Sequence, residues 1–163
     1  MKPGILYGIS IGTGDPELIT VKGLRILRSS DIVAFPAGVN NRLGVAQNII
    51  QDWLQPHQQI LPLEFPYVQD ELKLQTAWSK AAQQVWQELS LGKNIAFACL
   101  GDVNFYGTFT YLAQTLERSH AEITIETIPG VCSPMAINVT GNSSDRREVG
   151  FTSIFIRLNY HDN

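Results

Sequence analysis

Residues 6–36, LYGISIGTGDPELITVKGLRILRSSDIVAFP, decide the fold. The run Leu6–Ile11 is short, apolar and rich in β-branched residues, and Gly12 ends it, which is typical of a buried strand. The next segment predicts a helix over residues 17–28, because apolar residues recur about three apart: Leu18, Val21, Leu24 and Leu27. A second strand is predicted over 31–35, before a Pro-Ala-Gly turn.

The same alternation of strand and helix continues to about residue 130. Further strands are predicted over 59–65, 94–100 and 123–128, and further helices over 45–54, 70–91 and 107–118. Trp78 and Trp86 fall on the apolar stripe of the helix over 70–91, so we expect both to pack in the core. Repeated strand–helix–strand units require crossovers, which place helices on the faces of a parallel sheet. The predicted fold class is therefore α/β, with a five-stranded, mainly parallel sheet and one domain over residues 1–130.

The composition excludes several classes of function. A net charge of −3 and a pI of about 5.5 argue against a nucleic-acid backbone as the main partner. No apolar run approaches the ~18 residues that span a bilayer, and the opening MKPGILYGISIG becomes a glycine turn too early for a signal peptide. We therefore expect a soluble, cytoplasmic protein with no membrane partner.

The potential metal-binding residues are scattered. Cys99 and Cys132 form no CxxC motif, and we expect them to be small buried residues without a disulfide. The histidines, His57, His120 and His161, show no metal-ligand spacing, so solvated histidines and no metal site are expected.

The candidate binding residues follow the predicted strands. Ligands bind outside the carboxyl ends of the strands in open parallel sheets, and here those ends carry GTGDP, FPAG, FPYVQDE, LGDVNFYG and IPGVCS. Asp102 is the leading candidate, because a carboxylate directly after a buried strand needs hydrogen-bond donors. A ligand could supply those donors, or Asp102 could cap a local turn.

A dinucleotide-binding oxidoreductase domain is one alternative, and the details weaken it. Glu17 stands where the fingerprint needs its third glycine, and Asp15 would face a pyrophosphate. The second strand ends in Phe35-Pro36-Ala37, with no acid for a ribose hydroxyl, and the chain has no P-loop lysine. A ligand with little or no phosphate is favoured.

Three strings carry a resemblance to a known family. They are ISIGTGDPELITVKGLRILRSSDIVAFP (9–36), LGDVNFYGTFTYLAQTL (100–116) and ETIPGVCSPMA (126–136). They resemble motifs of the tetrapyrrole (corrin/porphyrin) methylases, and FPAG, LEFPYVQDE and GDVNFYGTF are most similar to the branch that methylates C20 of precorrin-2. The likeness covers about residues 6–136. It implies two α/β domains, a homodimer, and S-adenosyl-L-methionine bound in the cleft between the domains.

The resemblance also implies site residues, each matched to one position of this sequence. The implied cofactor-binding residues are Thr13, Leu100, Gly101, Asp102, Phe105, Cys132 and Ser133. Related uroporphyrinogen methylases carry an aspartate as a base at the end of the second strand. Pro36 stands there in this chain, so that role does not transfer and no catalytic residue is assigned.

The implied reaction is methyl transfer from the sulfonium to C20 of precorrin-2, or of its cobalt-loaded form, in cobalamin (vitamin B12) biosynthesis. The electron-rich macrocycle is the nucleophile, so the protein mainly aligns the reacting atoms and excludes water. The substrate carries many carboxylates, for which Arg42 or another cation near the cleft is a candidate partner.

The pattern breaks at about Gly141. The family continues into a second domain, but this chain continues NSSDRREVG, with no helical or strand period before FTSIFI. Codons allowed for Asn142 onward, read one nucleotide later, can spell IPLTVGRLALP, which is close to the family text. We hypothesise that residues 131–163 are a stub of the second domain with an out-of-frame tail from about 142. The nucleotide sequence across Gly141 tests this.

Alternatives to a C20-methyltransferase remain open at this stage. The chain could derive from another corrin or uroporphyrinogen methylase, or be a non-catalytic remnant. With half of the cofactor cleft missing, the hypothesis of a truncated second domain predicts impaired methyl transfer by this chain.

Overall fold

The computed structural model describes residues 2–38, 44–66, 68, 70–105 and 107–132, in which strands and helices alternate as the sequence predicts. The strands are β1 (Ile5–Ser10), β2 (Ile32–Pro36), β3 (Gln59–Leu63), β4 (Ile95–Cys99) and β5 (Thr124–Ile128). The helices are α1 (Val21–Ser29), α2 (Val45–Ile50), α3 (Glu71–Leu89) and α4 (Thr108–Ser119), with short 3-10 helices η1 (Pro16–Leu18) and η2 (Gln51–Trp53).

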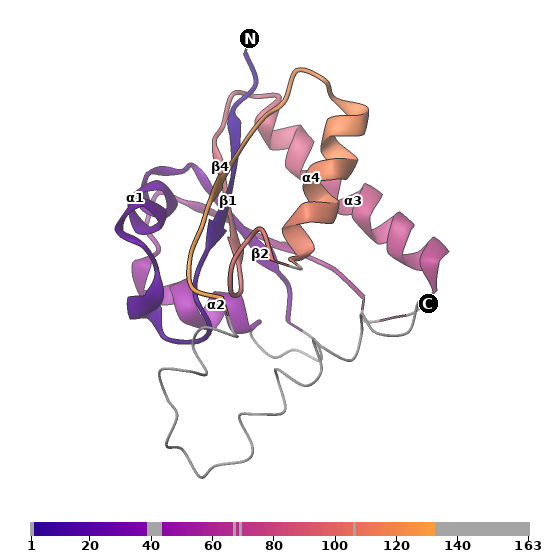
Figure 1. The fold of residues 1–163 in the computed structure, drawn as a ribbon. Coiled ribbons are helices and arrows are strands. Elements are labelled where there is room, and N and C mark those ends of the chain that lie inside the picture. The colour runs from indigo at the N-terminus through magenta and orange to yellow at the C-terminus, as the bar shows by residue number, and fades with distance from the viewer. Residues whose placement is uncertain (1, 39–43, 67, 69, 106, 133–163) are drawn as a thin grey trace.

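The strands form one five-stranded sheet in the order β3-β2-β4-β1-β5, and every pairing is parallel. Helices α3 and α4 cover one face of the sheet, and α1 and α2 cover the other (Figure 1). The predicted α/β fold class is confirmed. Because all strands run in the same direction, the turns that follow them gather at one edge, called here the carboxyl edge.

The outer strand β3 is protected from pairing with another strand. The Gln59 amide donates to the Asp31 carbonyl at 3.0 Å, so Gln59, Leu61 and Leu63 direct their backbone polar groups toward β2. The backbone edges of Ile60 and Pro62 therefore face outward. Pro62 has no N–H, which removes an outward donor from this edge.

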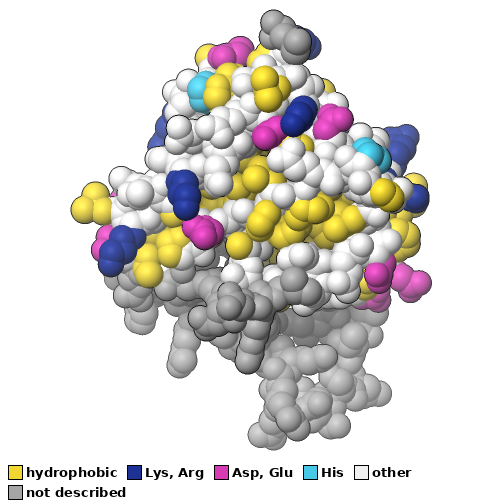
Figure 2. Space-filling model, turned by 180° about the vertical axis from the view of Figure 1, so that it is seen from behind, with side chains coloured by type: hydrophobic (Ala, Val, Ile, Leu, Met, Phe, Trp, Pro, Cys, Tyr) yellow, Lys and Arg dark blue, Asp and Glu magenta, His cyan; other side chains and the backbone are white. Residues whose placement is uncertain are grey.

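Seen from behind, a band of hydrophobic side chains crosses the molecule beside scattered charged groups (Figure 2).

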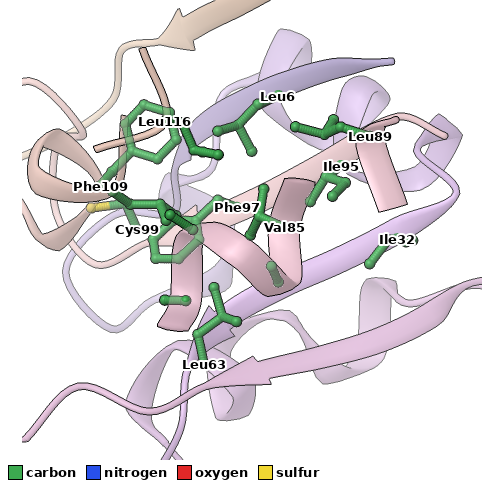
Figure 3. Close-up of a cluster of buried hydrophobic side chains, with 14 of the residues drawn as sticks. Leu6, Ile32, Leu63, Val85, Leu89, Ile95, Phe97, Cys99, Phe109 and Leu116 are labelled. Atoms are coloured by element: carbon green, nitrogen blue, oxygen red, sulfur yellow. The ribbon is translucent and has the colours of Figure 1, made fainter. Parts of the chain in front are cut away.

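The central strand β4 is buried on both faces. Ile95, Phe97 and Cys99 point into the cluster under α3 and α4, and Ala96 and Ala98 point into the cluster under α1 and α2. Figure 3 shows Phe97 between Val85 of α3 and Phe109 of α4. This two-sided burial explains why β4 reads as an unbroken apolar run.

Gly8 of β1 makes room for α4. A Cβ atom at Gly8 would lie 2.5 Å from Cε1 of Phe109, whose ring is buried. The ring of Phe109 in turn packs on that of Phe97, with 5.6 Å between their centroids. A glycine inside a strand weakens the strand, so its packing role explains its presence here.

The predicted helix over residues 17–28 is wrong at its start. Asp15 caps the short helix η1, accepting from the Glu17 amide, and Pro16 occupies the first position. Ile19 and Thr20 are then extended, and Thr20 caps α1 by accepting from the Gly23 amide at 3.1 Å. Two side-chain caps in six residues interrupt a helix that apolar spacing alone predicts as continuous. The helix predicted over 45–54 similarly divides into α2 and η2.

The two tryptophans of α3 are only partly core residues. Both are half-buried, and Trp86 packs against the core and stacks on His120, with ring centroids 3.7 Å apart. Trp78 lies against Phe65 and Tyr111, at centroid distances of 4.7 and 5.1 Å. His120 is therefore not the solvated histidine that the sequence suggested, because it ends α4 against an aromatic ring.

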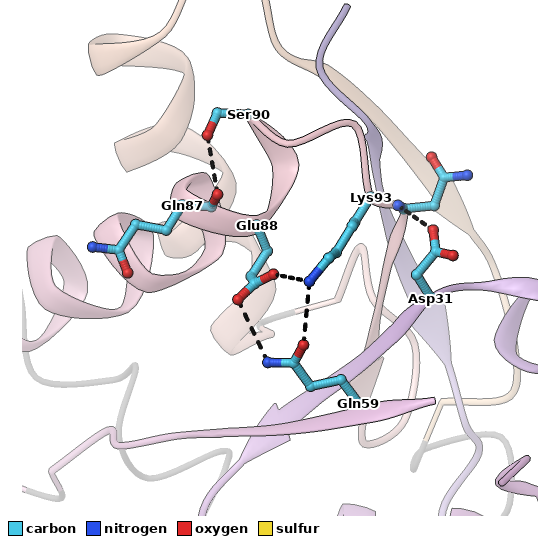
Figure 4. A network of polar contacts seen from close by, with 7 residues as sticks. Asp31, Gln59, Gln87, Glu88, Ser90 and Lys93 are labelled. Carbon is cyan, nitrogen blue, oxygen red and sulfur yellow. Dashed lines mark hydrogen bonds and ion pairs between the residues drawn. The ribbon is translucent and has the colours of Figure 1, made fainter. Parts of the chain in front are cut away.

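A polar network closes the opposite edge of the sheet, called here the amino edge. The Lys93 ammonium lies 2.6 Å from Oε2 of Glu88, and Gln59 bridges to both side chains (Figure 4). Beside it, Oδ2 of Asp31 accepts from the Asn94 amide at 2.8 Å. These contacts tie the start of β3 and the start of β4 to the end of α3.

We expect Lys93→Met to lower the free energy of unfolding by roughly 0.5–1 kcal/mol at pH 7, since the pair is partly exposed. The hydrogen bond from Lys93 lowers the pKa of Glu88 below its ordinary value of 4.5. The pair therefore stabilises the fold above that ordinary pKa, and its contribution is lost as the pH falls through the lowered pKa. Urea unfolding of both proteins at pH 7 and pH 3 measures this. An equal difference at both pH values would contradict it.

Candidate functional site

The turns after β1 and β4 are joined at the carboxyl edge. The Gly101 amide donates to the Gly12 carbonyl at 2.7 Å, and the Ile11 amide donates to the Cys99 carbonyl at 3.0 Å. Gly12 and Gly101 have φ of 73° and 75°, a left-handed conformation that favours glycine. Thr13, half-buried, directly follows Gly12, and Leu100 directly precedes Gly101. The structure thus brings together two of the glycine turns that the sequence analysis singled out.

A second junction connects three strand ends through Ser10 and Asp102. Ser10 is fully buried at the end of β1, and its hydroxyl donates to the Ile128 carbonyl at 2.7 Å and accepts from the Val103 amide at 2.8 Å. Oδ2 of Asp102 accepts from the Gly130 amide at 2.7 Å and lies 3.4 Å from the Ser10 hydroxyl. The turns after β4 and β5 are therefore both fixed to the last residue of β1.

The donors to Asp102 come from the protein. Besides the Gly130 amide, the Asn104 amide donates to Oδ1 of Asp102 at 2.8 Å, which makes a local turn of the kind that the sequence analysis kept as an alternative. A carboxylate that accepts these bonds holds the turn in shape. The remaining lone pairs of the Asp102 carboxylate could still accept from a ligand.

Sequence reasoning missed Ser10, and it included Gly130 only as part of the turn string IPGVCS. A Cβ atom at Gly130 would lie 2.5 Å from Cβ of Ser10, so a larger residue would push the turn after β5 away from β1. The available signal was a single hydroxyl in the apolar strand ILYGIS, because a buried polar group is nearly always hydrogen-bonded. Its partners lie 93 and 118 residues away, and no local pattern indicates them.

The remaining predicted site residues fall around these junctions. The Phe105 amide donates to the Asp102 carbonyl at 3.1 Å, and the Phe105 side chain is 51% exposed. Cys132 is half-buried and stands two residues after Gly130. Ser133 and Arg42, and the tail from Asn142, lie outside the described residues.

Comparison with known proteins identifies the family. The sequence pattern of the tetrapyrrole (corrin/porphyrin) methylases matches residues 5–144. The chain belongs to this family. The assignment removes the oxidoreductase alternative, and it agrees with the resemblance carried by the strings at the strand ends.

Several relatives of this tetrapyrrole methylase chain are similar over most of its length. It is 35% identical over 134 residues to the cobalt-precorrin-2 C(20)-methyltransferase of Salmonella typhimurium, covering 82% of the chain and 55% of that protein. It is 30% identical over 131 residues to a probable cobalt-precorrin-2 C(20)-methyltransferase of Methanocaldococcus jannaschii, covering 80% and 54%. The chain therefore spans about half the length of the curated relatives it matches.

Solved structures support the fold. The structure of a cobalt precorrin-4 methyltransferase superposes with a TM-score of 0.60 at 27% identity, covering 85% of this chain and 51% of that one. This likeness confirms the α/β sheet with its flanking helices as the architecture of a tetrapyrrole methylase domain.

The thiols of this tetrapyrrole methylase chain differ in environment. Cys99 is 4% exposed, and burial raises the pKa of its thiol to about 11. The Cys99 thiol is therefore protonated at pH 8 and shielded from reagents, whereas the Cys132 side chain is only half-buried. The expectation of two buried cysteines is correct for Cys99 and wrong for Cys132.

We expect one of the two thiols to react quickly with Ellman's reagent in the native protein, and the second only after unfolding. Cys132→Ser should remove the fast phase and leave the slow one. A fast phase that persists in that variant would contradict the buried placement of Cys99.

No metal centre or membrane span is found in the described part of the chain. Among the described residues, no group of three His, Cys, Asp or Glu side chains is placed to hold a metal ion. None of the described helices is both long and apolar enough to cross a membrane.

Proposed function

We propose that this chain is part of an S-adenosylmethionine-dependent methyltransferase that methylates C20 of precorrin-2, or of its cobalt-loaded form, in cobalamin biosynthesis. The observation that carries the proposal is the 35% identity to a protein named cobalt-precorrin-2 C(20)-methyltransferase, over 82% of the chain. Another corrin methylase is the alternative, supported by the 27% identity to a cobalt precorrin-4 methyltransferase.

The residues at the carboxyl edge fit S-adenosylmethionine. The cofactor-binding set of the proposal is Thr13, Leu100, Gly101, Asp102, Phe105, Cys132 and Ser133. Gly14, with a φ of 139°, has open space where a side chain would stand, so a ligand can approach this backbone closely. The half-exposed ring of Phe105 offers an apolar surface, and the turn after β4 offers backbone groups and a carboxylate. When bound, the cofactor supplies a methyl group made electrophilic by its sulfonium.

The chain's own residues would then act by positioning. The Gly12–Gly101 contact and the Ser10–Asp102–Gly130 contacts fix three turns relative to one another before any ligand arrives. A preorganised edge of this kind holds the reacting atoms of two ligands in line, which is the main requirement when the substrate itself is the nucleophile. No acid or base of this chain is assigned a proton transfer.

The proposal includes the wider setting implied by the family resemblance. We propose a homodimer, a cytoplasmic location and no metal cofactor, with precorrin-2 or cobalt-precorrin-2 as the small-molecule partner. Size-exclusion chromatography with light scattering measures the dimer directly, and a monomer at all concentrations would contradict it.

Amide NMR tests the cofactor site independently of turnover. On titration with S-adenosylhomocysteine, we expect the signals of Thr13, Gly101 and Cys132 to shift together along one binding curve. Lys93 and Asn94 at the amino edge serve as the control and should not move. Shifts confined to the amino edge, or no shifts at millimolar ligand, would contradict the proposed site.

The regiochemistry is tested with a labelled methyl group. In the product that this chain forms, even if slowly, from precorrin-2 and S-adenosylmethionine carrying a carbon-13 methyl, carbon NMR should place the label at C20. A label at another carbon would favour a different corrin methylase. A cobalt-loaded substrate in a parallel reaction decides which form is used.

A further inference from the structure

A cavity of about 780 Å³ opens at the carboxyl edge beside the junctions described above. Its walls are Ala37 and Gly38 after β2, residues 64–66 after β3, and the first three turns of α3. Strands β2 and β4 are neighbours, so the turn after β2 that borders the cavity belongs to the strand beside the one whose turn carries Asp102. The two regions share one edge but use different strands.

The cavity combines an apolar surface with two solvent-exposed ion pairs. Phe65, Leu72 and Ala77 supply the apolar part, and the Leu72 side chain is 75% exposed. Nζ of Lys80 lies 2.9 Å from Oε2 of Glu64, and the two side chains are 63% and 76% exposed. Nζ of Lys73 lies 3.5 Å from Oδ2 of Asp70, and the two side chains are 70% and 45% exposed.

These two ion pairs are weak enough to open. Pairs this exposed contribute little to stability, because water screens them and the long side chains lose freedom. A ligand carboxylate could therefore replace Glu64 or Asp70 as the partner of either lysine. Figure 2 shows lysine or arginine and acidic side chains beside hydrophobic ones on the face opposite to the view of Figure 1.

The spacing of the lysines selects a large ligand. Lys73 and Lys80 are seven residues apart on α3, so they project from the same face about 10 Å apart along the axis. A ligand that meets both needs two acidic groups separated by an apolar body of that size. A tetrapyrrole with carboxylates around a flat apolar ring meets this description.

We propose that this cavity binds the carboxylated rim of the tetrapyrrole, and that Lys73 and Lys80 pair with two of its carboxylates. The inference rests on the proposed function and adds the location of the substrate to it. Glu64 and Asp70 hold the lysines in place in the free protein and compete with the substrate. The turns over β4, β1 and β5 remain for the cofactor, so the two ligands meet over the centre of the sheet.

Uroporphyrin III, a stable octacarboxylate, tests the proposal in the full 163-residue chain through quenching of tryptophan fluorescence. We expect Lys73→Met/Lys80→Met to weaken binding at least tenfold and Glu64→Gln to strengthen it about threefold. The controls, Lys93→Met and Glu88→Gln, each remove one charge of the same kind at the amino edge and should leave the affinity within twofold. A cationic porphyrin should not bind to the cavity of the wild-type chain.

Removing Lys73 and Lys80 should weaken porphyrin binding, and removing the charge of Glu64 should strengthen it. These opposite changes in affinity show that Glu64 competes with the ligand for Lys80 and does not merely support the structure. Weaker binding in Glu64→Gln, equal losses in Lys93→Met and the double variant, or no binding by the wild type would each overturn the inference. S-adenosylhomocysteine titrations of the same variants should be unchanged. If the cofactor analogue fails to bind while the porphyrin results hold, the proposed methyltransferase function fails and the anion site stands.

Discussion

Replacing Phe97 with alanine is expected to reduce the free energy of unfolding by about 3–5 kcal/mol. Phe97 is fully buried in the central strand, and its ring contacts Phe65 and Phe109 at centroid distances of 6.4 and 5.6 Å. Removing the ring leaves a cavity that helices α3 and α4 cannot both close, since each is fixed to the sheet elsewhere. A loss of this size is a large part of the 5–15 kcal/mol typical of a domain.

Chemical denaturation followed by circular dichroism measures the effect of Phe97→Ala. Phe97→Leu is the matched variant, and it should lose only about 1–2 kcal/mol because most of the volume is kept. The slope of the transition should stay unchanged in both variants if the same surface is exposed on unfolding. Equal stability of the alanine variant and the wild type would show that the α3–α4 layer does not close on β4 as described.

The sequence predicts the elements of this fold well, for a physical reason. A strand buried on both faces, such as β4, needs apolar residues at every position, and a helix such as α4 needs them on one side only. Both patterns of apolar residues lie within one short segment, so the order of residues in that segment is enough to predict the strand or the helix. The exceptions are short: Asp15 begins η1 and Thr20 begins α1 through side-chain hydrogen bonds that apolar spacing ignores.

The order of the strands could not be predicted in the same way. Placing β4 between β2 and β1 depends on which helices cover which face, and this is decided by contacts between distant residues. Gly8 is one example, since it allows the ring of Phe109 to approach β1 across a hundred residues of sequence. Neither residue alone indicates the other.

The candidate site likewise contains residues that a local sequence pattern indicates and residues whose roles depend on distant contacts. Gly12, Gly101 and Asp102 are identifiable because turns after strands concentrate glycine and acids at the carboxyl edge. The role of Ser10 and its contact with Gly130 are not identifiable, because they exist only once three strand ends meet. The sequence analysis therefore found Gly12, Gly101 and Asp102, and missed their contacts with each other and with Ser10.

Asp102→Asn is expected to destabilise the protein by about 1.5–3 kcal/mol and to weaken S-adenosylhomocysteine binding at least tenfold. The carboxylate accepts from the amides of Gly130 and Asn104, at 2.7 and 2.8 Å. An asparagine side chain has one acceptor and one donor group, so one of these amides would face an NH₂ group. The turns after β4 and β5 would then separate, and both belong to the proposed cofactor site.

Asp31→Asn is the matched control for that variant. Asp31 also accepts from a backbone amide, that of Asn94 at 2.8 Å, but it is exposed and lies at the amino edge. We expect a loss of only about 0.5–1.5 kcal/mol and unchanged binding of S-adenosylhomocysteine. Thermal unfolding and the amide NMR titration measure both quantities in each variant. If Asp102→Asn loses stability but binds the cofactor analogue as the wild type does, Asp102 only supports the fold. If both variants weaken binding equally, the effect is a general loss of stability, and the carboxyl edge is not the cofactor site.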